Sequence, residues 1–376
     1  MIIQQGIKYK NKPWKFLAPE NKLKKPLVFV FGNRFLLEEE SVYAQMKDIF
    51  PDGEIVFGST SGEILGEQVL ENSICFTAVE FSQSSYVIHR ANSKNFDTAE
   101  ALGISIIKDL PKEGLRHVFV ISEGSNVNGS TLIEGLEKFL PKTINITGGL
   151  CGDDSRFQKT LASYNSTPKE GEVVVIGFYG DTLEVSYANY GGWTSFGPER
   201  IITKSKDNVL FELDGKPALD LYKEYLGDKA KELPEAALLY PLNVQIKGDK
   251  HTIVRTILNI DEKNNSMILA GDVPKGSKVQ LMMSTVDDIV EGASKAASFG
   301  MRNRKSKPEL ALLVSCIGRK LVLDQRTEEE VEEVLEVIGD QATIAGFYSY
   351  GEMAPFEGQD HCKLHNQTMT LTLISE

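Results

Sequence analysis

The sequence predicts an α/β protein of two domains, with mixed β-sheets that are covered by helices and built from repeated strand-loop-helix-strand units. Three observations support this class. Apolar runs of strand length alternate with stretches of helical periodicity. The order of strand, polar loop, helix, strand, glycine loop and strand begins three times, near residues 26, 115 and 308. The chain has 376 residues, 41% of them hydrophobic and 25% charged, which suits two or three globular domains.

The first unit follows a lysine-rich stretch, so we expect residues 1–25 to form a basic N-terminal arm. Residues 27–31 are all apolar and are bounded by proline and glycine, which is typical of a buried strand. Residues 36–50 place apolar side chains on one face and glutamates in the first turn, which predicts an amphipathic helix. Strands at residues 55–57 and 74–81 complete the unit.

The second unit repeats this order after a helix at residues 95–110, whose start has a capping residue followed by a glutamate. A strand at 118–121 leads into a polar loop at 122–129, and a helix at 130–140 follows. Further strands are expected at residues 144–147, 160–165 and 172–179.

The pattern breaks between residues 183 and 226, and then returns near the end of the chain. Antiparallel strands with polar turns are expected at residues 237–240, 252–260 and 278–283. The third unit is expected as a helix at 285–299, a strand at 310–314, a helix at 327–338 and a strand at 368–373. We therefore expect two domains, at residues 26–215 and 216–376.

Three glycine loops have a common pattern, at residues 55–63, 146–154 and 344–352. In each, a β-branched run meets a glycine, and a few small or aromatic residues and a carboxylate follow. Glycine permits positive φ or the close approach of another group to the backbone. The carboxylate is either a polar contact for a ligand or a solvated acid after a tight turn. We expect the three loops to follow equivalent strand ends of the three units.

Composition and motifs exclude several classes of protein. The net charge of −12 argues against nucleic acid as a general partner. None of the four cysteines forms a CxxC motif, so a zinc ribbon or a dithiol redox site is not indicated. The sequence has no apolar segment long enough for a secretion signal or a membrane span, so we expect a cytoplasmic protein. Dinucleotide-binding, P-loop and nucleophile-elbow motifs are not met, so no enzyme is indicated.

The histidines nearest the C-terminus leave two interpretations open. His361 and His365 could bind a metal together with Cys362 and Asp360. The preferred interpretation is that His365 and its neighbour Asn366 form hydrogen bonds to an adjacent turn. We therefore expect no metal site.

Three stretches of the chain resemble the FIST family, and the resemblance covers nearly the whole sequence. They are GGLCGD at residues 148–153, the stretch at 197–226 that contains LDGKPALDLYKEYL, and the end, with GFYSYGEMAPF and LHNQTMTLTLI. The family comprises bacterial and archaeal sensory proteins with paired FIST N and FIST C domains. The resemblance implies a signal-transduction sensor that binds a small ligand such as an amino acid. It also implies a separate partner chain, such as a histidine kinase or a diguanylate cyclase in a two-component system.

Two other functions stay open at this point. A subset of FIST proteins resembles haem-bound nitric-oxide sensors, for which His365 is the first candidate ligand to iron and His361 the second. No cofactor is otherwise expected. A hydrolase would need Cys316 or Cys151 as nucleophile with a nearby histidine.

The expected ligand pocket lies between the two halves of the chain. We expect it to be lined by Gly149, Cys151, Arg319, Tyr348, Glu352 and His365. Arg319 and Glu352 carry the opposite charges that an amino acid's carboxylate and ammonium require. The alternative is that Arg319 bridges to a structural acid, or that these two charges pair with each other. If Arg319 binds the carboxylate, Arg319→Ala should lose roughly 2–5 kcal/mol of binding while folding is nearly unaffected.

Overall fold

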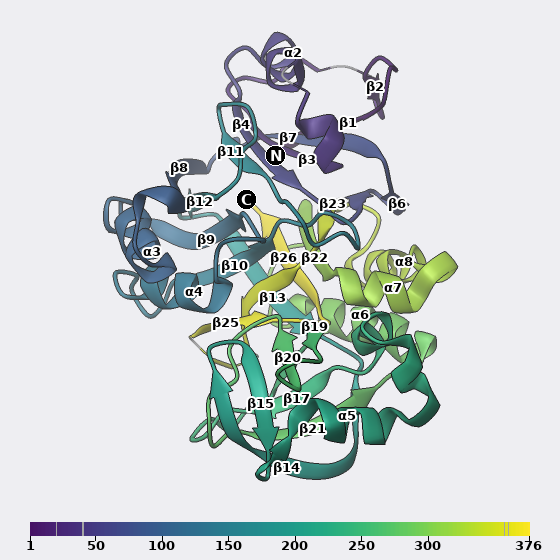
Figure 1. The fold of residues 1–376 in the computed structure, drawn as a ribbon. Helices are drawn as coiled ribbons and strands as arrows, with labels where there is room; N and C mark the ends of the chain where they lie inside the picture. Colours follow the sequence, from purple (N-terminus) through teal and green to yellow (C-terminus); the bar gives the residue numbers. More distant parts are fainter. Residues whose placement is uncertain (20, 40, 357, 360) are drawn as a thin grey trace.

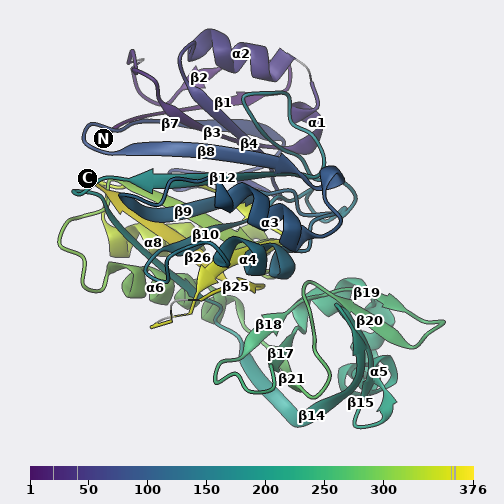
Figure 2. The ribbon, with the colours of Figure 1, turned by 90° about the vertical axis from the view of Figure 1, so that its left-hand side faces the viewer.

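The computed structural model describes residues 1–19, 21–39, 41–356, 358–359 and 361–376. Figures 1 and 2 show two parts: a large body of three sheets and a smaller β-rich module with one long helix beside it. The body contains the chain up to residue 190 and from residue 286 onward, and the module contains residues 194–283. Within the described ranges, no helix is long and apolar enough to cross a membrane.

The first unit of the body is a six-stranded sheet of order β11-β4-β3-β7-β1-β2. Strands β3 and β4 run parallel, and β7 runs antiparallel to β3. Part of the expected N-terminal arm belongs to this sheet, because β1 pairs with β7 along its whole length. The elements are β1 (Ile2–Tyr9), β2 (Lys15–Phe16), β3 (Leu27–Gly32), α1 (Arg34–Leu37), α2 (Ser41–Ile49), β4 (Glu54–Ser59), β7 (Ser73–Glu80) and β11 (Ala162–Tyr164).

The second unit has the sheet order β25-β24-β10-β9-β12-β8. Helices α3 and α4 pack closely on each other because Gly103 and Gly135 face each other's backbone. A Cβ on Gly135 would lie 2.2 Å from the carbonyl oxygen of Glu100. The elements are β8 (Ser85–Asn92), η1 (Ser93–Asn95), α3 (Ala99–Lys108), β9 (Leu115–Ser122), α4 (Gly129–Glu137), β10 (Asn145–Leu150), β12 (Glu172–Tyr179), β24 (Gly351–Pro355) and β25 (Cys362–His365).

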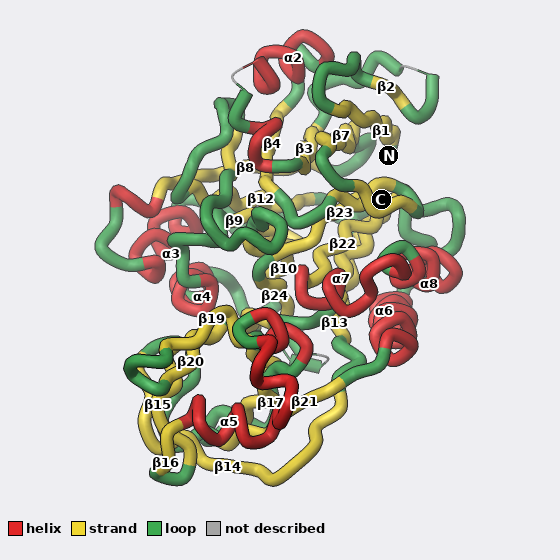
Figure 3. Tube along the Cα trace, turned by 45° about the vertical axis from the view of Figure 1, so that its right-hand side comes forward, coloured by secondary structure: helices red, strands yellow, loops and turns green. Residues whose placement is uncertain are grey.

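The third unit has the sheet order β13-β26-β22-β23-β5-β6. Its helices lie on the outside of the sheet, as α2 does in the first unit and α3 and α4 do in the second (Figure 3). The elements are β5 (Glu63–Leu65), β6 (Gln68–Leu70), β13 (Glu184–Tyr190), α6 (Val286–Met301), β22 (Leu310–Cys316), α7 (Ile317–Leu323), η4 (Asp324–Arg326), α8 (Glu329–Ile338), β23 (Thr343–Ser349) and β26 (Met369–Ser375).

Each sheet is completed by strands that follow the glycine loop of a neighbouring unit. The hairpin β5–β6 leaves the first unit and pairs with β23 of the third. The hairpin β24–β25 leaves the third unit and pairs with β10 of the second. Strand β11 leaves the second unit and pairs with β4 of the first. The exchange is cyclic, so no sheet of the body is complete without another unit.

The three glycine loops meet where these exchanges begin. In each loop, the seventh residue of the common pattern donates its N–H to the carbonyl oxygen of the fifth residue of the next loop. The bonds join Ser61 to Tyr348 at 2.8 Å, Gly152 to Ser59 at 2.9 Å and Tyr350 to Leu150 at 3.1 Å. They form a closed ring, which we call the loop ring. The predicted equivalence of the three loops is therefore confirmed.

The core of the body lies between the sheets and includes residues from all three. Phe31 of β3 packs on Phe347 of β23 with ring centroids 4.7 Å apart, and Phe29 packs edge-on against Phe119 of β9. Gly149 faces this core, where a Cβ would lie 2.6 Å from a methyl group of Val314. A side chain at position 149 would therefore separate the second and third sheets.

The β-rich module has a core of its own around helix α5. Its strands are all antiparallel, and β14 is long enough to join two halves of the eight-stranded sheet. The elements are β14 (Thr194–Lys206), β15 (Val209–Leu213), β16 (Lys216–Pro217), α5 (Ala218–Leu226), η2 (Gly227–Glu232), η3 (Glu235–Leu239), β17 (Leu242–Gln245), β18 (Ile253–Arg255), β19 (Ile257–Asp261), β20 (Ser266–Leu269) and β21 (Lys278–Met283). The boundary expected at residues 215 and 216 falls within the turn between β15 and β16.

Three local expectations differ from the structure. Residues 237–240 were expected in a strand, but most of them belong to the 3₁₀ helix η3, with prolines at 234 and 241 that lack the N–H donors of a strand. The helix expected at 36–50 is divided into α1 and α2. The segment after β22 was expected as a polar loop, yet it forms α7. The last difference matters most, because α7 carries Arg319 and Lys320.

The glutamates that end two of the glycine loops are fully buried. Glu63 accepts hydrogen bonds from Thr60 Oγ1 at 2.6 Å and from Ser73 Oγ at 2.5 Å. Glu352 accepts equivalent bonds from the hydroxyls of Ser349 and Thr368, at 2.6 and 2.9 Å. Burial raises the pKa of both carboxyl groups to about 8, and the hydrogen bonds offset this rise only in part.

We therefore predict that the protein loses stability as pH rises toward 8. Because both pKa values lie above the ordinary 4.5, the folded state holds protons that the unfolded chain has released. The contribution of each carboxyl group to the free energy of unfolding is largest below pH 4.5. It falls by about 1.4 kcal/mol per pH unit as pH rises, and it is lost as pH passes about 8. Thermal unfolding between about pH 6.5 and 8.5 should show it, above the range in which histidines take up protons.

The control for this prediction is the double variant Glu63→Gln, Glu352→Gln. Glutamine keeps a hydrogen-bonding side chain of the same size but does not titrate. The melting temperature of the variant should depend much less on pH over the same range. An equal slope in the parent and the variant would show that other groups cause the pH dependence.

Candidate functional site

The structure brings the six residues that were predicted to line one pocket into smaller groups and not around one cavity. Gly149, Glu352 and His365 are register partners on β10, β24 and β25, and Arg319 and Tyr348 both contact Glu330. Gly149 and Cys151 lie in the core between the sheets, and burial, reinforced by Glu123, raises the pKa of the Cys151 thiol. Tyr348 is also fully buried, and its hydroxyl donates to Glu330 at 2.5 Å. Glu352 is enclosed by its hydroxyl donors, whereas His365 borders a cavity. The role of the six as ligand contacts stays a prediction.

Arg319 is held inside the protein by four polar contacts. Its guanidinium group pairs with Glu330 at 2.7 and 2.8 Å, and donates to the carbonyl oxygens of Gly191 and Ile289 at 2.5 and 2.8 Å. Glu330 also accepts from Ser315 Oγ at 2.9 Å. The ion pair therefore ties α7 and α8 to α6 and to the chain that enters the β-rich module. This arrangement supports a structural role for Arg319.

The two histidines near the C-terminus have different surroundings. His365 is buried, its Nε2 lies 2.9 Å from the carbonyl oxygen of Ala354, and burial lowers its pKa to about 4. His361 is 62% exposed and lies 3.4 Å from Glu137 on α4. Asp360, the other ligand considered for a metal, lies outside the described residues. Among the described residues, no group of three potential ligands comes together around a metal position.

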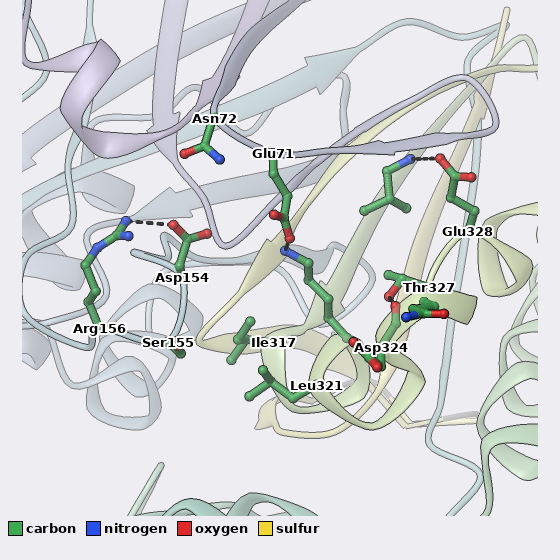
Figure 4. Close-up of a pocket in the computed structure, with 13 residues that line it drawn as sticks. Glu71, Asn72, Asp154, Ser155, Arg156, Ile317, Leu321, Asp324, Thr327 and Glu328 are labelled. Carbon is green, nitrogen blue, oxygen red and sulfur yellow. Dashed lines mark hydrogen bonds and ion pairs between the residues drawn. The ribbon is translucent and has the colours of Figure 1, made fainter.

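A cavity of about 550 Å³ lies beside the loop ring, where all three units meet (Figure 4). We call it the junction cavity. The hairpin β5–β6 and the residues after it contribute from the first unit, the end of the second glycine loop contributes from the second, and α7 with the start of α8 contributes from the third. Its lining comprises Val69, Glu71, Asn72, Asp154, Ser155, Arg156, Ile317, Lys320, Leu321, Asp324, Gln325, Thr327 and Glu328.

Lys320 connects the junction cavity to the loop ring. Its Nζ donates to the carbonyl oxygen of Ser61 at 2.8 Å and pairs with Glu71 at 2.5 Å. The side chain of Lys320 is 12% exposed, whereas that of Glu71 is 59% exposed. Gly62 leaves room for this lysine, because a Cβ there would lie 3.1 Å from Nζ and φ is +137°. Lys320 is thus fixed in place, and Glu71 is a partner that another anion can replace.

A second ion pair lies at another point of the cavity wall. Arg156 pairs with Asp154 at 2.7 Å, and it also pairs with the buried Asp153. Burial lowers the pKa of Arg156, but the hydrogen bond that Arg156 donates to Asp153 and the charge of Asp154 outweigh this and raise the pKa. Asp153 is held further by Arg34 Nε at 3.0 Å. Figure 4 shows Arg156 and Asp154 at a distance from Glu71.

The junction cavity can therefore bind a small molecule that carries both charges. Lys320 and Arg156 offer cations, while Glu71, Asp154 and Asp324 offer carboxylates. The apolar side chains of Ile317 and Leu321 provide a surface for an uncharged side chain. Nucleophilic catalysis by cysteine is not favoured, because burial raises the pKa of the Cys151 and Cys316 thiols and disfavours the thiolate.

Sequence reasoning placed Arg319 at the pocket because it follows the buried strand β22, where a polar loop was expected. The structure directs its neighbour Lys320 toward the junction cavity instead. In the helix α7, adjacent residues point in different directions, so Arg319 faces the interior and Lys320 faces the cavity. Glu71 and Arg156 were missed entirely, because neither lies in a motif.

Comparison with known proteins shows the family. The models of the FIST N domain and the FIST C domain match residues 26–216 and 218–355. The chain therefore belongs to the FIST family, whose domains are sensory domains that bind small ligands.

A relative and a solved structure are also similar to this chain. An uncharacterised protein of Methanocaldococcus jannaschii is 27% identical over 273 residues, which are 62% of this chain and 49% of that protein. The chain thus spans about half the length of this relative. The crystal structure of a cyanuric acid hydrolase from A. caulinodans matches 78% of this chain and 99% of that one, at 10% identity and a TM-score of 0.19.

The network around Arg319 predicts that Arg319→Ala destabilises the fold. Removing one member of a buried ion pair leaves the other charge unpaired and typically costs about 3–5 kcal/mol. Arg326→Ala is the control, because Arg326 is 45% exposed and its pair with Glu329 should contribute less than about 1 kcal/mol. Chemical denaturation measures both changes. If Arg319→Ala unfolds like the parent protein, Arg319 is free for the ligand-binding role that the sequence suggested.

Proposed function

We propose that this protein is a cytoplasmic sensor that binds an amino acid in the junction cavity and signals to a separate partner such as a histidine kinase or a diguanylate cyclase. The observation that carries the proposal is the pairing of cations with carboxylates around one cavity that all three units line. A zwitterion fits such a wall because each of its charges finds an opposite one. The membership of the FIST family supports a sensory role.

The binding mode follows from the exposure of the side chains. The ligand carboxylate replaces Glu71 on Lys320, since Glu71 is 59% exposed and can turn toward water at little cost. The ligand ammonium is then bound by the carboxylates of Asp154, Asp324 or the displaced Glu71. Side chains of the ligand lie on Ile317 and Leu321.

Binding in this cavity changes the contacts between units. Lys320 is bonded to Ser61 of the loop ring, and Asp154 accepts a hydrogen bond from Tyr350 at 2.9 Å through its carbonyl oxygen. A ligand that is held by both residues therefore acts on loops from all three units. A ligand shifts a conformational equilibrium only by its differential affinity for the two states. We infer that the arrangement of the units is the quantity that the partner detects.

Calorimetric titration with the standard amino acids tests this function. At least one should bind, and Lys320→Gln should weaken its binding by about 2 kcal/mol or more, roughly thirty-fold, because the ligand carboxylate loses its partner. Lys231→Gln is the matched control, since Lys231 is 81% exposed and pairs only with a neighbour on η2. The proposal fails if no amino acid binds, or if Lys320→Gln binds it as tightly as the parent protein does.

Haem is the second candidate ligand, and one observation favours it. A carbonyl oxygen only accepts hydrogen bonds, so Nε2 of His365 donates to Ala354 and Nδ1 keeps its lone pair. Histidines that bind metals commonly donate their other N–H in this way. His361, the second candidate, is exposed beside Glu137 and borders a different surface.

The visible spectrum of the purified protein after incubation with haemin tests this alternative. Binding through His365 predicts a strong Soret band that His365→Ala removes. His361→Ala serves as the control and should leave the band unchanged. A protein that stays colourless, or a band that survives in His365→Ala, contradicts this role for His365.

A further inference from the structure

A second cavity, of about 450 Å³, lies between the body and the β-rich module. We call it the seam cavity. Residues of β13, α6 and the hairpin β24–β25 line it from the body, and residues of β17, β18 and β21 line it from the module. The lining comprises Asn189, Tyr190, Gly191, Gly192, Trp193, Asn243, His251, Thr252, Val254, Met282, Phe299, Phe356, His365 and Thr368.

The wall of the seam cavity is aromatic and uncharged. Tyr190, Trp193, Phe299 and Phe356 all border it, and His251 stacks on Phe356 with ring centroids 4.9 Å apart. None of the described residues that line it is an aspartate, glutamate, lysine or arginine. The junction cavity, by contrast, is lined by charges of both signs. The two cavities therefore suit different classes of ligand.

One polar group in the wall lacks a partner. Asn243 donates through Nδ2 to Ser195 Oγ at 3.0 Å. Its Oδ1 is buried and has no hydrogen-bond partner within the described structure. Buried polar atoms are normally paired, because an unpaired one loses its hydration without compensation. A ligand that donates an N–H to Oδ1 would provide the missing bond.

We propose that the seam cavity is a second ligand site, which binds a neutral, planar heteroaromatic molecule with a ring N–H or amino donor. The rings of Trp193, Phe356 and their neighbours contact the faces and edges of the ligand. Asn243 Oδ1 accepts the donor hydrogen. Nucleobases and fused imidazoles belong to this class. The site is separate from the junction cavity and does not depend on amino-acid binding there.

Because the seam cavity lies between the body and the module, a ligand there also links these two parts of the protein. The chain enters the module through Gly191, Gly192 and Trp193, and the carbonyl oxygen of Gly191 is held by Arg319. Gly192 has a φ of +82° and lies against α6, where a Cβ would be 2.2 Å from the carbonyl oxygen of Asp288. The entry to the module is therefore fixed to the body. A ligand that contacts both walls adds a further bridge beside this entry and holds the module in place.

Fluorescence titration tests the seam site. The chain has two tryptophans, so Trp14→Phe, which keeps an aromatic ring beside Phe76, leaves Trp193 as the reporter. Adenine and benzimidazole are the probes, and 2-piperidone, which has an N–H but no aromatic ring, is the control compound. We expect the two probes to quench Trp193 saturably and 2-piperidone to have no effect.

Two variants in this background locate the bound probe. Asn243→Leu removes the acceptor and should weaken binding at least tenfold. Val254→Phe fills the cavity and should abolish binding, which keeps the test valid if Asn243→Leu does not fold. Asn259→Leu, at an exposed position of β19 in the same module, is the matched control and should bind normally.

Three results would overturn the proposal. They are the absence of saturable quenching by both probes, unchanged affinity in the folded Asn243→Leu and Val254→Phe variants, and equal binding of 2-piperidone. Amino-acid titrations of the same variants should stay normal, because the junction cavity is elsewhere. Failure of the seam site is therefore distinguishable from failure of the proposed sensory function.

Discussion

The loop ring is the constraint on which the rest of the body depends. Each of its three hydrogen bonds joins backbone groups of two units, at 2.8, 2.9 and 3.1 Å. A chain that leaves one unit at the ring can only continue beside the next unit, so β5, β11 and β24 complete sheets other than their own. The buried Glu63 and Glu352 follow from the same geometry, because each ends a loop of the ring and enters a neighbouring sheet. Their hydroxyl donors three residues earlier explain why a carboxyl group is tolerated there.

The cyclic exchange also explains why cavities form where units meet. The junction cavity lies between the hairpin β5–β6 and α7 of the unit that the hairpin joins. Two further cavities also lie where units meet. One lies between the hairpin β24–β25 and the loop before α4, and the other is lined by the segments that flank β11, by η1 with the end of β8, and by Glu38 after α1. The residues that line these two cavities differ in kind from each other. The β-rich module contributes Leu258 and Leu269 to the first of these, whereas charged residues such as Lys159 and Glu170 dominate the second. Only the junction cavity combines ion pairs with a direct bond from a lysine to the loop ring among the described residues.

Much of the fold could be predicted from the sequence, because its strands are short apolar runs and helices such as α3, α4 and α6 begin at a capping side chain. The three glycine loops were recognisable because their pattern is local. The way in which they exchange strands was not, since pairing between β5 and β23 joins residues far apart in the sequence. The candidate site depended on such pairing and on one unpredicted helix. Arg319 and Lys320 are adjacent cations that cannot be assigned to the interior or the surface until α7 is known. Glu71 and Arg156 line the same cavity as Lys320 only through the exchange.

The adjacent residues Arg319 and Lys320 differ in the burial of their partners, which fits a structural role for Arg319 and the proposed binding role for Lys320. Arg319 has no exposed side-chain surface, and its partner Glu330 is equally buried, so this pair is permanent in the folded state. Lys320 is also mostly enclosed, but its partner Glu71 is on the surface and gains little from the pair in water. In the proposed binding mode, a ligand carboxylate would compete only with this weak, solvent-screened partner, while Ser61 of the loop ring maintains the position of Lys320. Binding in this mode would act on the loop ring itself, because Lys320 is hydrogen-bonded to the backbone that joins the units.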